Sequence, residues 1–260
     1  MTMGFFDGIS SPVLTVILNH DDTAERVLEL IREGLAEGAE AFCIQFEKLA
    51  PEDRTEENYR RILRACEGRP VYACDYRKNN TLAQTDEEIE RELLLLADLG
   101  AELVDVQGDL FCPSVDQIAR EPEAAARQKR LIQSLHERGC EVLMSSHTFR
   151  YMQPQEVIEL MQVQQQRGAD VMKVVAKADT DEEAADAFLT SARIRKELGT
   201  KHLFIVGGKK RGAHRFLSGE LGDCLLLCTV DSRPDFQPPI SAVKKCKALR
   251  ESFCALQEQA

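Results

Sequence analysis

The chain has 260 residues, of which 43% are hydrophobic, 30% charged and 6% aromatic, with no tryptophan. Its 44 acidic and 33 basic residues give a formal net charge of −11, which disfavours binding to nucleic acid or to an anionic membrane surface. No apolar run reaches the roughly 18 residues of a membrane-spanning helix, and segment 1–6 lacks a signal-peptide pattern. We therefore expect a soluble, cytoplasmic protein.

Eight short apolar runs, rich in β-branched residues, recur at spacings of roughly thirty residues and predict β-strands. In chain order they are Val13–Leu18, Ala41–Phe46, Val71–Tyr76, Leu103–Gln107, Glu141–Ser145, Val171–Ala176, His202–Val206 and Cys224–Val230. The longer segments between them carry apolar residues at spacings of three and four, as in 86–99, and predict amphipathic helices. Acidic residues at 85–88 and 179–182 indicate helix starts, and Gly100 and Gly199 indicate the matching ends.

Eight strand–helix units in a chain of this length are typical of a (β/α)8 barrel. A doubly wound sheet would more often show a glycine-rich turn after its first strand, but Leu18 is followed by Asn19-His20-Asp21-Asp22. The sequence therefore predicts a single-domain (β/α)8 TIM barrel over residues 1–260. Its active site is expected at the carboxyl ends of the strands.

The nine cysteines are odd in number and mostly lie in or beside the apolar runs. A reduced cysteine in such a place acts as a small hydrophobic residue, so we expect free structural thiols in a reducing compartment. The closest pair, Cys224 and Cys228, has no second pair at zinc-binding spacing, although a metal site is the alternative interpretation.

Two ionisable residues stand near the ends of neighbouring predicted strands. Lys173 lies inside the run 171–176, and His147 follows the run 141–145. A desolvated lysine loses its proton more easily, and its neutral amine can attack a ketone to form a Schiff base. A nearby histidine can move the protons that this reaction needs. The alternatives are an ion pair of Lys173 with a carboxylate such as Asp105, and a structural role for His147.

Several sequence features together match one enzyme family. They are Leu143-Met144-Ser145-Ser146-His147, Lys173 about 25 residues later, Asp105-Val106-Gln107, Leu217-Ser218-Gly219-Glu220, and Ser232 with Gln237 ahead of Ile240-Ser241. From Pro12 to about Phe253 the chain resembles the type I 3-dehydroquinate dehydratases. These are Schiff-base (β/α)8 lyases of the shikimate pathway, which leads to the aromatic amino acids.

The resemblance implies a reaction and a set of site residues. Lys173 would form a Schiff base with 3-dehydroquinate, and His147 would remove the adjacent proton and protonate the departing hydroxyl, giving 3-dehydroshikimate. The residues expected to bind this small anionic ketone are Gln45, Glu47, Arg77, Gln107, Arg215, Ser232 and Gln237. The resemblance also implies no metal and no organic cofactor, and a cytoplasmic homodimer.

The chain departs from the family pattern where substrate would bind. The family's Glu-x-Arg on the second strand reads Gln45-Phe46-Glu47, and its Asp-x-Glu on the fourth reads Asp105-Val106-Gln107. Two family arginines fall on Tyr76 and Phe216, beside Arg77 and Arg215. Fewer carboxylates near Lys173 would favour its neutral form. About a dozen extra residues near 112–126 are expected beside the barrel mouth.

These departures leave two alternatives open. One is a Schiff-base lyase or aldolase-like paralogue that acts on another small anionic ketone. The other is a barrel that has lost catalysis and serves as a binding module. The basic segment 209–215, expected after the seventh strand, either binds a substrate carboxylate or phosphate or is a solvated loop.

Overall fold

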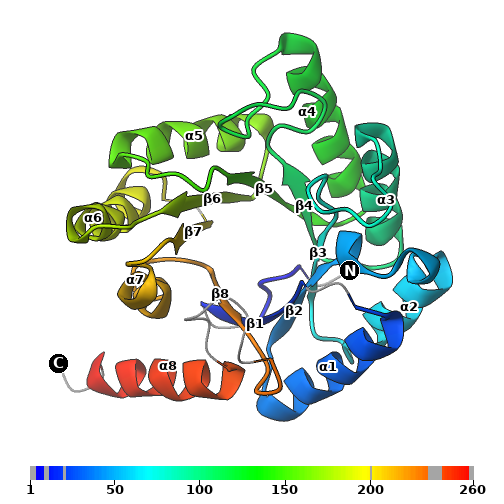
Figure 1. The fold of residues 1–260 in the computed structure, drawn as a ribbon, viewed down its shortest axis with the longest axis horizontal. Coiled ribbons are helices and arrows are strands. Elements are labelled where there is room, and N and C mark those ends of the chain that lie inside the picture. Colours follow the sequence, from blue (N-terminus) through cyan, green and yellow to red (C-terminus); the bar gives the residue numbers. More distant parts are fainter. Residues whose placement is uncertain (1–3, 9–11, 20–21, 200, 234–241, 258–260) are drawn as a thin grey trace.

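The computed structural model describes residues 4–8, 12–19, 22–199, 201–233 and 242–257 (Figure 1). The strands are β1 (Val13–Leu18), β2 (Ala41–Gln45), β3 (Val71–Cys74), β4 (Leu103–Gln107), β5 (Glu141–His147), β6 (Val171–Lys177), β7 (His202–Gly207) and β8 (Leu225–Cys228). The α-helices are α1 (Ala24–Glu37), α2 (Glu56–Ala65), α3 (Asp86–Asp98), α4 (Pro122–Glu137), α5 (Pro154–Arg167), α6 (Asp181–Glu197), α7 (Gly212–Leu217) and α8 (Val243–Gln257). Two short 3-10 helices, Phe46–Lys48 and Pro51–Asp53, follow β2.

The strands form one parallel sheet in the order β7-β6-β5-β4-β3-β2-β1-β8, which curves into a nearly closed barrel with the helices outside it (Figure 1). The ends of the sheet meet between β7 and β8. There the Cys224 N–H donates to the His202 carbonyl at 2.9 Å, and the Phe204 N–H donates to the Asp223 carboxyl at 2.8 Å. The predicted single-domain (β/α)8 barrel is confirmed.

Strand alternation divides the apolar side chains into two layers. On each strand, every second side chain points inward, and these residues, including Ala41, Tyr72, Leu103 and Leu225, form a cluster inside the barrel. The residues between them point outward and pack with the helices into a larger outer cluster. Because neighbouring residues of a strand face opposite sides, each polar residue with inward parity is brought toward the barrel axis.

Helix boundaries agree with the sequence signals. Thr85 and Thr180 each accept a hydrogen bond from the backbone three residues on, and Glu88 and Glu183 return one, forming capping boxes before α3 and α6. Strand ends differ more from the prediction. β3 ends at Cys74 rather than at residue 76, whereas β5 and β6 run further than predicted, to His147 and Lys177.

All nine cysteines are free thiols, and seven of them are buried. This agrees with their predicted role as small hydrophobic residues. Over the described part of the chain, no helix is both long and apolar enough to cross a membrane.

Candidate active site

Lys173 lies at the centre of the barrel, on the inward face of β6. Its side chain is buried, with the residue only 4% exposed. The ammonium donates hydrogen bonds to the hydroxyls of Tyr72 and Tyr76, each at 2.9 Å, and lies 3.3 Å from an Asp105 carboxylate oxygen. The apolar interior of the barrel therefore encloses the Lys173 ammonium together with three polar partners, Tyr72, Tyr76 and Asp105.

Asp105 is the anion of this cluster, and it faces inward from β4. The same oxygen, Oδ2, accepts hydrogen bonds from Tyr72 and from Tyr76, the latter at 2.5 Å. Its other oxygen accepts from the Ser145 hydroxyl at 2.6 Å. The ion pair that the sequence left as an alternative is therefore present.

The charge on Lys173 differs from the sequence-based expectation. Burial by itself lowers the pKa of an ammonium, but the attraction of Asp105 outweighs burial and leaves the pKa of Lys173 raised. The expectation that fewer carboxylates would give a neutral lysine is corrected, because the carboxylate retained on β4 is in contact with the amine.

His147 ends β5 and lies beside this cluster. Its ring is edge-on to Tyr76, with the centroids 5.0 Å apart, and stacks on Phe149 at 5.9 Å. The backbone N–H of His147 donates to the Gln117 side chain at 2.6 Å, which fixes the end of the strand. Burial, reinforced by the charge of Lys173, holds the pKa of His147 well below its usual value. The imidazole is therefore neutral and able to accept a proton.

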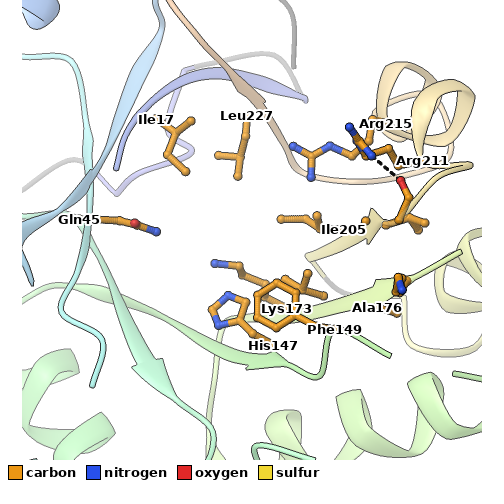
Figure 2. A pocket seen from close by; sticks show the side chains of 15 residues that line it. Ile17, Gln45, His147, Phe149, Lys173, Ala176, Ile205, Arg211, Arg215 and Leu227 are labelled. Atoms are coloured by element: carbon orange, nitrogen blue, oxygen red, sulfur yellow. Dashed lines mark hydrogen bonds between the residues drawn. The ribbon is translucent and has the colours of Figure 1, made fainter. Parts of the chain in front are cut away.

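A cavity of about 300 Å³ opens over Lys173 and His147 at the carboxyl end of the barrel. Figure 2 shows Lys173, Gln45 and Arg215 directed into it from different sides. Arg215 reaches it from α7. Burial lowers the pKa of this guanidinium to about 10, so that it stays cationic at neutral pH. The guanidinium makes no hydrogen bond or ion pair with the described residues, and its charge is available to an anion.

A second cavity of about 410 Å³ adjoins the first, and the two share Gln45, His147 and Phe149. Its further lining residues are four amides, one phenol and three ionisable groups: Asn19, Asn79, Gln107, Gln117, Tyr76, Glu47, Lys48 and Lys78. Glu47 is 1% exposed, and one of its carboxyl oxygens has no hydrogen-bond partner in the described structure. Burial raises the pKa of Glu47 well above its usual value, which favours the neutral, protonated form of the side chain.

The structure does not bring every predicted residue to these cavities. The Arg77 side chain is paired with Asp86 at 2.8 Å and with Asp109 at 3.4 Å and does not line either of them. The Ser232 hydroxyl donates to Glu33 of α1 at 2.5 Å and is likewise not among their lining residues. Gln237 lies outside the described residues.

The predicted insertion near 112–126 forms most of an irregular loop that precedes α4. Ser146 donates its hydroxyl to the Gln117 backbone carbonyl at 2.7 Å, so the loop is attached to the end of β5. Gly108 permits this approach, because a Cβ there would lie 2.4 Å from the same carbonyl oxygen. Through Gln117 the loop contributes to the lining of the second cavity. That the segment is an insertion relative to the family stays a prediction.

Two groups of site residues were missed from the sequence. Tyr72 and Tyr76 contact the Lys173 amine, and Gln117 holds the backbone of His147. The tyrosines have a visible signal, since Tyr72, Cys74 and Tyr76 are alternate residues of the predicted strand 71–76 and would face the same side. Gln117 has none, because its position depends on how a long loop folds back.

The fold and the site together define a (β/α)8 barrel whose mouth holds a buried lysine, a neutral histidine and an arginine without an ion-pair partner among the described residues. A model of the family described as type I 3-dehydroquinase matches residues 18–251. The chain belongs to this family of hydro-lyases.

Solved structures show the same fold. The 3-dehydroquinate dehydratase of Geobacillus kaustophilus HTA426 has a TM-score of 0.79 and 12% identity, covering 95% of this chain and 93% of that one. The type I 3-dehydroquinate dehydratase of Clostridium difficile has a TM-score of 0.77 and 12% identity, covering 95% of this chain and 94% of that one. The 3-dehydroquinate dehydratase of Aquifex aeolicus VF5 has a TM-score of 0.71 and 16% identity, covering 93% of this chain and 98% of that one. No curated protein sequence matches the chain.

Proposed function

We propose that the protein dehydrates 3-dehydroquinate to 3-dehydroshikimate through a Schiff base on Lys173. The observation that supports this most directly is the position of the Lys173 amine, which faces the same cavity as His147 and Arg215. Family membership supplies the reaction class, a hydro-lyase.

The proposed chemistry assigns one role to each group. The Lys173 amine adds to the ketone and water leaves, so that an iminium forms. The neutral His147 imidazole removes a proton from the adjacent carbon, and the iminium accepts the electron pair. The protonated His147 then donates its proton to the hydroxyl that departs from the neighbouring carbon. Hydrolysis of the conjugated iminium frees the product and the lysine.

Substrate binding is proposed to divide between the two cavities. Arg215, assisted by Arg211 on the same wall, holds the carboxylate. The amides of Gln45 and Gln107 and the neutral acid of Glu47 can each donate and accept hydrogen bonds, which suits hydroxyl groups. Gln237 remains a predicted contact.

The test is reduction with borohydride in the presence of 3-dehydroquinate, followed by mass spectrometry of the peptides. We expect an adduct on Lys173 in the native chain and none in Lys173→Ala. Lys177→Ala is the matched control, because Lys177 lies on the same strand but is exposed and paired with Asp179 at 2.5 Å. A folded native protein without an adduct, or an adduct that survives Lys173→Ala, would contradict the proposal.

A Schiff-base lyase or aldolase-like enzyme for another small anionic ketone is the second candidate. The buried neutral Glu47 favours it, since it stands where the resemblance places an arginine. Trapping with other keto acids, but not with 3-dehydroquinate, would identify this enzyme. A binding module would give no trapping with any carbonyl compound.

We also propose that the protein works in the cytoplasm as a homodimer. Nine free thiols suit a reducing compartment, and the family resemblance supports the dimer. Sedimentation equilibrium gives the mass in solution, and a monomer at all concentrations would contradict the dimer.

A further inference from the structure

Two tyrosines bridge the amine and the carboxylate at the centre of the barrel. The Tyr76 hydroxyl accepts a hydrogen bond from Lys173 at 2.9 Å and donates one to Asp105 at 2.5 Å. Tyr72 makes the same pair of contacts. Each phenol is therefore placed to take a proton from the amine on one side while giving its own to the carboxylate on the other.

The two phenols differ in their access to substrate. Tyr72 lies within β3 and is 0% exposed. Tyr76 comes two residues after β3 ends, is 7% exposed, and is among the residues that line the second cavity. Its ring is also edge-on to His147, at 5.0 Å. Unlike Tyr72, Tyr76 therefore reaches a cavity, and this cavity adjoins the one that Lys173 lines, with His147 bordering both.

Lys173 needs a proton acceptor before it can react. An ammonium has three N–H donors and no lone pair, and it faces three acceptors, the two phenols and Asp105. The titratable groups around the amine are Cys43, Tyr72, Cys74, Tyr76, Asp105 and His147. Within this set, Asp105 is the carboxylate in contact with the amine, and the phenols connect the two.

We propose that Tyr76 is a catalytic residue that relays protons between Lys173, Asp105 and the carbonyl oxygen while the Schiff base forms. The inference rests on the proposed imine chemistry at Lys173. In the first step a proton moves from the Lys173 nitrogen to the Tyr76 oxygen as the phenol proton moves to Asp105. This leaves a neutral amine, a neutral phenol and a neutral carboxylic acid.

The remaining steps balance without any further reactant. The amine lone pair forms the N–C bond, and the C=O π pair moves to oxygen. Tyr76 takes a second proton from nitrogen and passes its own to that oxygen, giving the carbinolamine. Asp105 then returns its proton through Tyr76 to the hydroxyl, the C–O bond breaks, and the nitrogen lone pair forms C=N. Of the three ammonium protons, one stays on the iminium and two leave in water.

The test compares Tyr76→Phe with Tyr72→Phe, since each variant removes one hydroxyl that bridges the same two groups. The probe is glyoxylate, a small anionic carbonyl compound, with cyanoborohydride, and the readout is the rate of adduct formation on Lys173. We expect Tyr76→Phe to slow the reaction about 100-fold and Tyr72→Phe less than about 5-fold. In Tyr76→Phe the rate should also rise about tenfold per pH unit near neutrality, because the proton must then leave to solvent.

Equal slowing in both variants, with the pH profile of the native chain, would show a structural role and overturn the relay. A native rate in Tyr76→Phe would overturn it too, as would a native Lys173 that forms no glyoxylate adduct. An adduct with glyoxylate but none with 3-dehydroquinate would defeat the proposed substrate, while the expected difference between the two variants would still support the relay. Melting temperatures close to native in both variants establish that the folds are comparable.

Discussion

The state of a single lysine decides what the site can do. Lys173 is buried, which disfavours its charge, yet Asp105 raises its pKa, so that the resting amine is an ammonium. As an ammonium, Lys173 has no lone pair and is not a nucleophile. It must transfer a proton to an acceptor before it can attack a ketone. Activation then depends on the hydrogen-bonded partners of Lys173 rather than on burial.

Replacing Asp105 by asparagine tests this balance. The variant keeps the shape but removes the anion, so burial should dominate and the pKa of Lys173 should fall below that in the native chain. The pH dependence of arylation by trinitrobenzenesulfonate, measured on the Lys173 peptide, gives this value. Ser145→Ala is the control, because it removes a donor to Asp105 but keeps the carboxylate. An unchanged titration midpoint in Asp105→Asn would mean that Asp105 does not set the charge.

At the residue level, the candidate residues Lys173 and His147 were predicted from the sequence, but the side chains that contact them, Tyr72, Tyr76 and Gln117, were not. Lys173 and His147 stand out because polar residues in apolar strands are rare. After the third strand, the resemblance led us to expect an arginine as the substrate-binding residue, which favoured Arg77 over its neighbour Tyr76. In the structure, Arg77 is paired with Asp86. Parity along the strand from Tyr72 would have indicated the inward position, whereas the pairing of Arg77 depends on the loop fold.

At the scale of elements, strand ends decide which side chains reach the cavities. The sequence predicts the strands well because their apolar runs are short and bounded, and seven of the eight strands begin at the predicted residue. Ends are harder to predict, because polar residues such as Ser146 and His147 can continue a ladder when a neighbouring strand provides partners. The extension of β5 places His147 inside the sheet and so orients its ring.

The position of the loop before α4 could be predicted from the sequence, but its conformation could not. Several of the contacts that hold this loop run from side chains elsewhere in the barrel to the loop backbone. Gln128 of α4 donates to the carbonyls of Gly108 and Leu110 at 2.8 and 3.0 Å, and Arg167 of α5 donates to that of Ala119 at 2.6 Å. These anchors lie outside the loop itself, which is why no local pattern reveals its path.

Replacing Gln117 by alanine should reduce turnover by about tenfold with little change in stability. The variant removes the acceptor for the His147 backbone N–H and a wall of the second cavity, but Ser146 still holds the loop through the carbonyl of residue 117. Steady-state kinetics and thermal unfolding measure the two effects. Val115→Ala is the matched control, since Val115 is in the same loop and 88% exposed. Equal losses in both variants would show that the effect comes from the loop as a whole.

At the scale of the whole molecule, the barrel closes least completely between β7 and β8. Asp223 lies at this seam, buried, with one oxygen accepting the Phe204 N–H and the other without a partner in the described structure. Helix α7 lies beside the same gap (Figure 1). Arg215, on this helix, lines the first cavity. The number of strand–helix units was sufficient to predict the barrel, but the seam depends on the register of strands far apart in sequence.

The buried Asp223 makes global stability depend on pH. Burial raises its pKa to about 8 in the folded state, from 3.8 for an exposed aspartate. Between these values the folded chain binds a proton that the unfolded chain has lost. The contribution of Asp223 to the free energy of unfolding is therefore fully present below the lower value and decreases as pH rises toward 8.

Asp223→Asn removes this dependence and keeps the acceptor for the Phe204 N–H. We compare the free energy of unfolding of the variant with that of the native chain. The difference, variant minus native, should increase by about 2–3 kcal/mol from about pH 5 to about pH 7, because only the native chain loses the contribution of Asp223. Urea unfolding at the two pH values measures it. His214, whose pKa burial lowers to about 4, shifts stability in the opposite direction, but it is present in both proteins and cancels in the difference. A difference independent of pH would mean that Asp223 is already ionised in the fold, with Arg215 as the nearby cation that stabilises it.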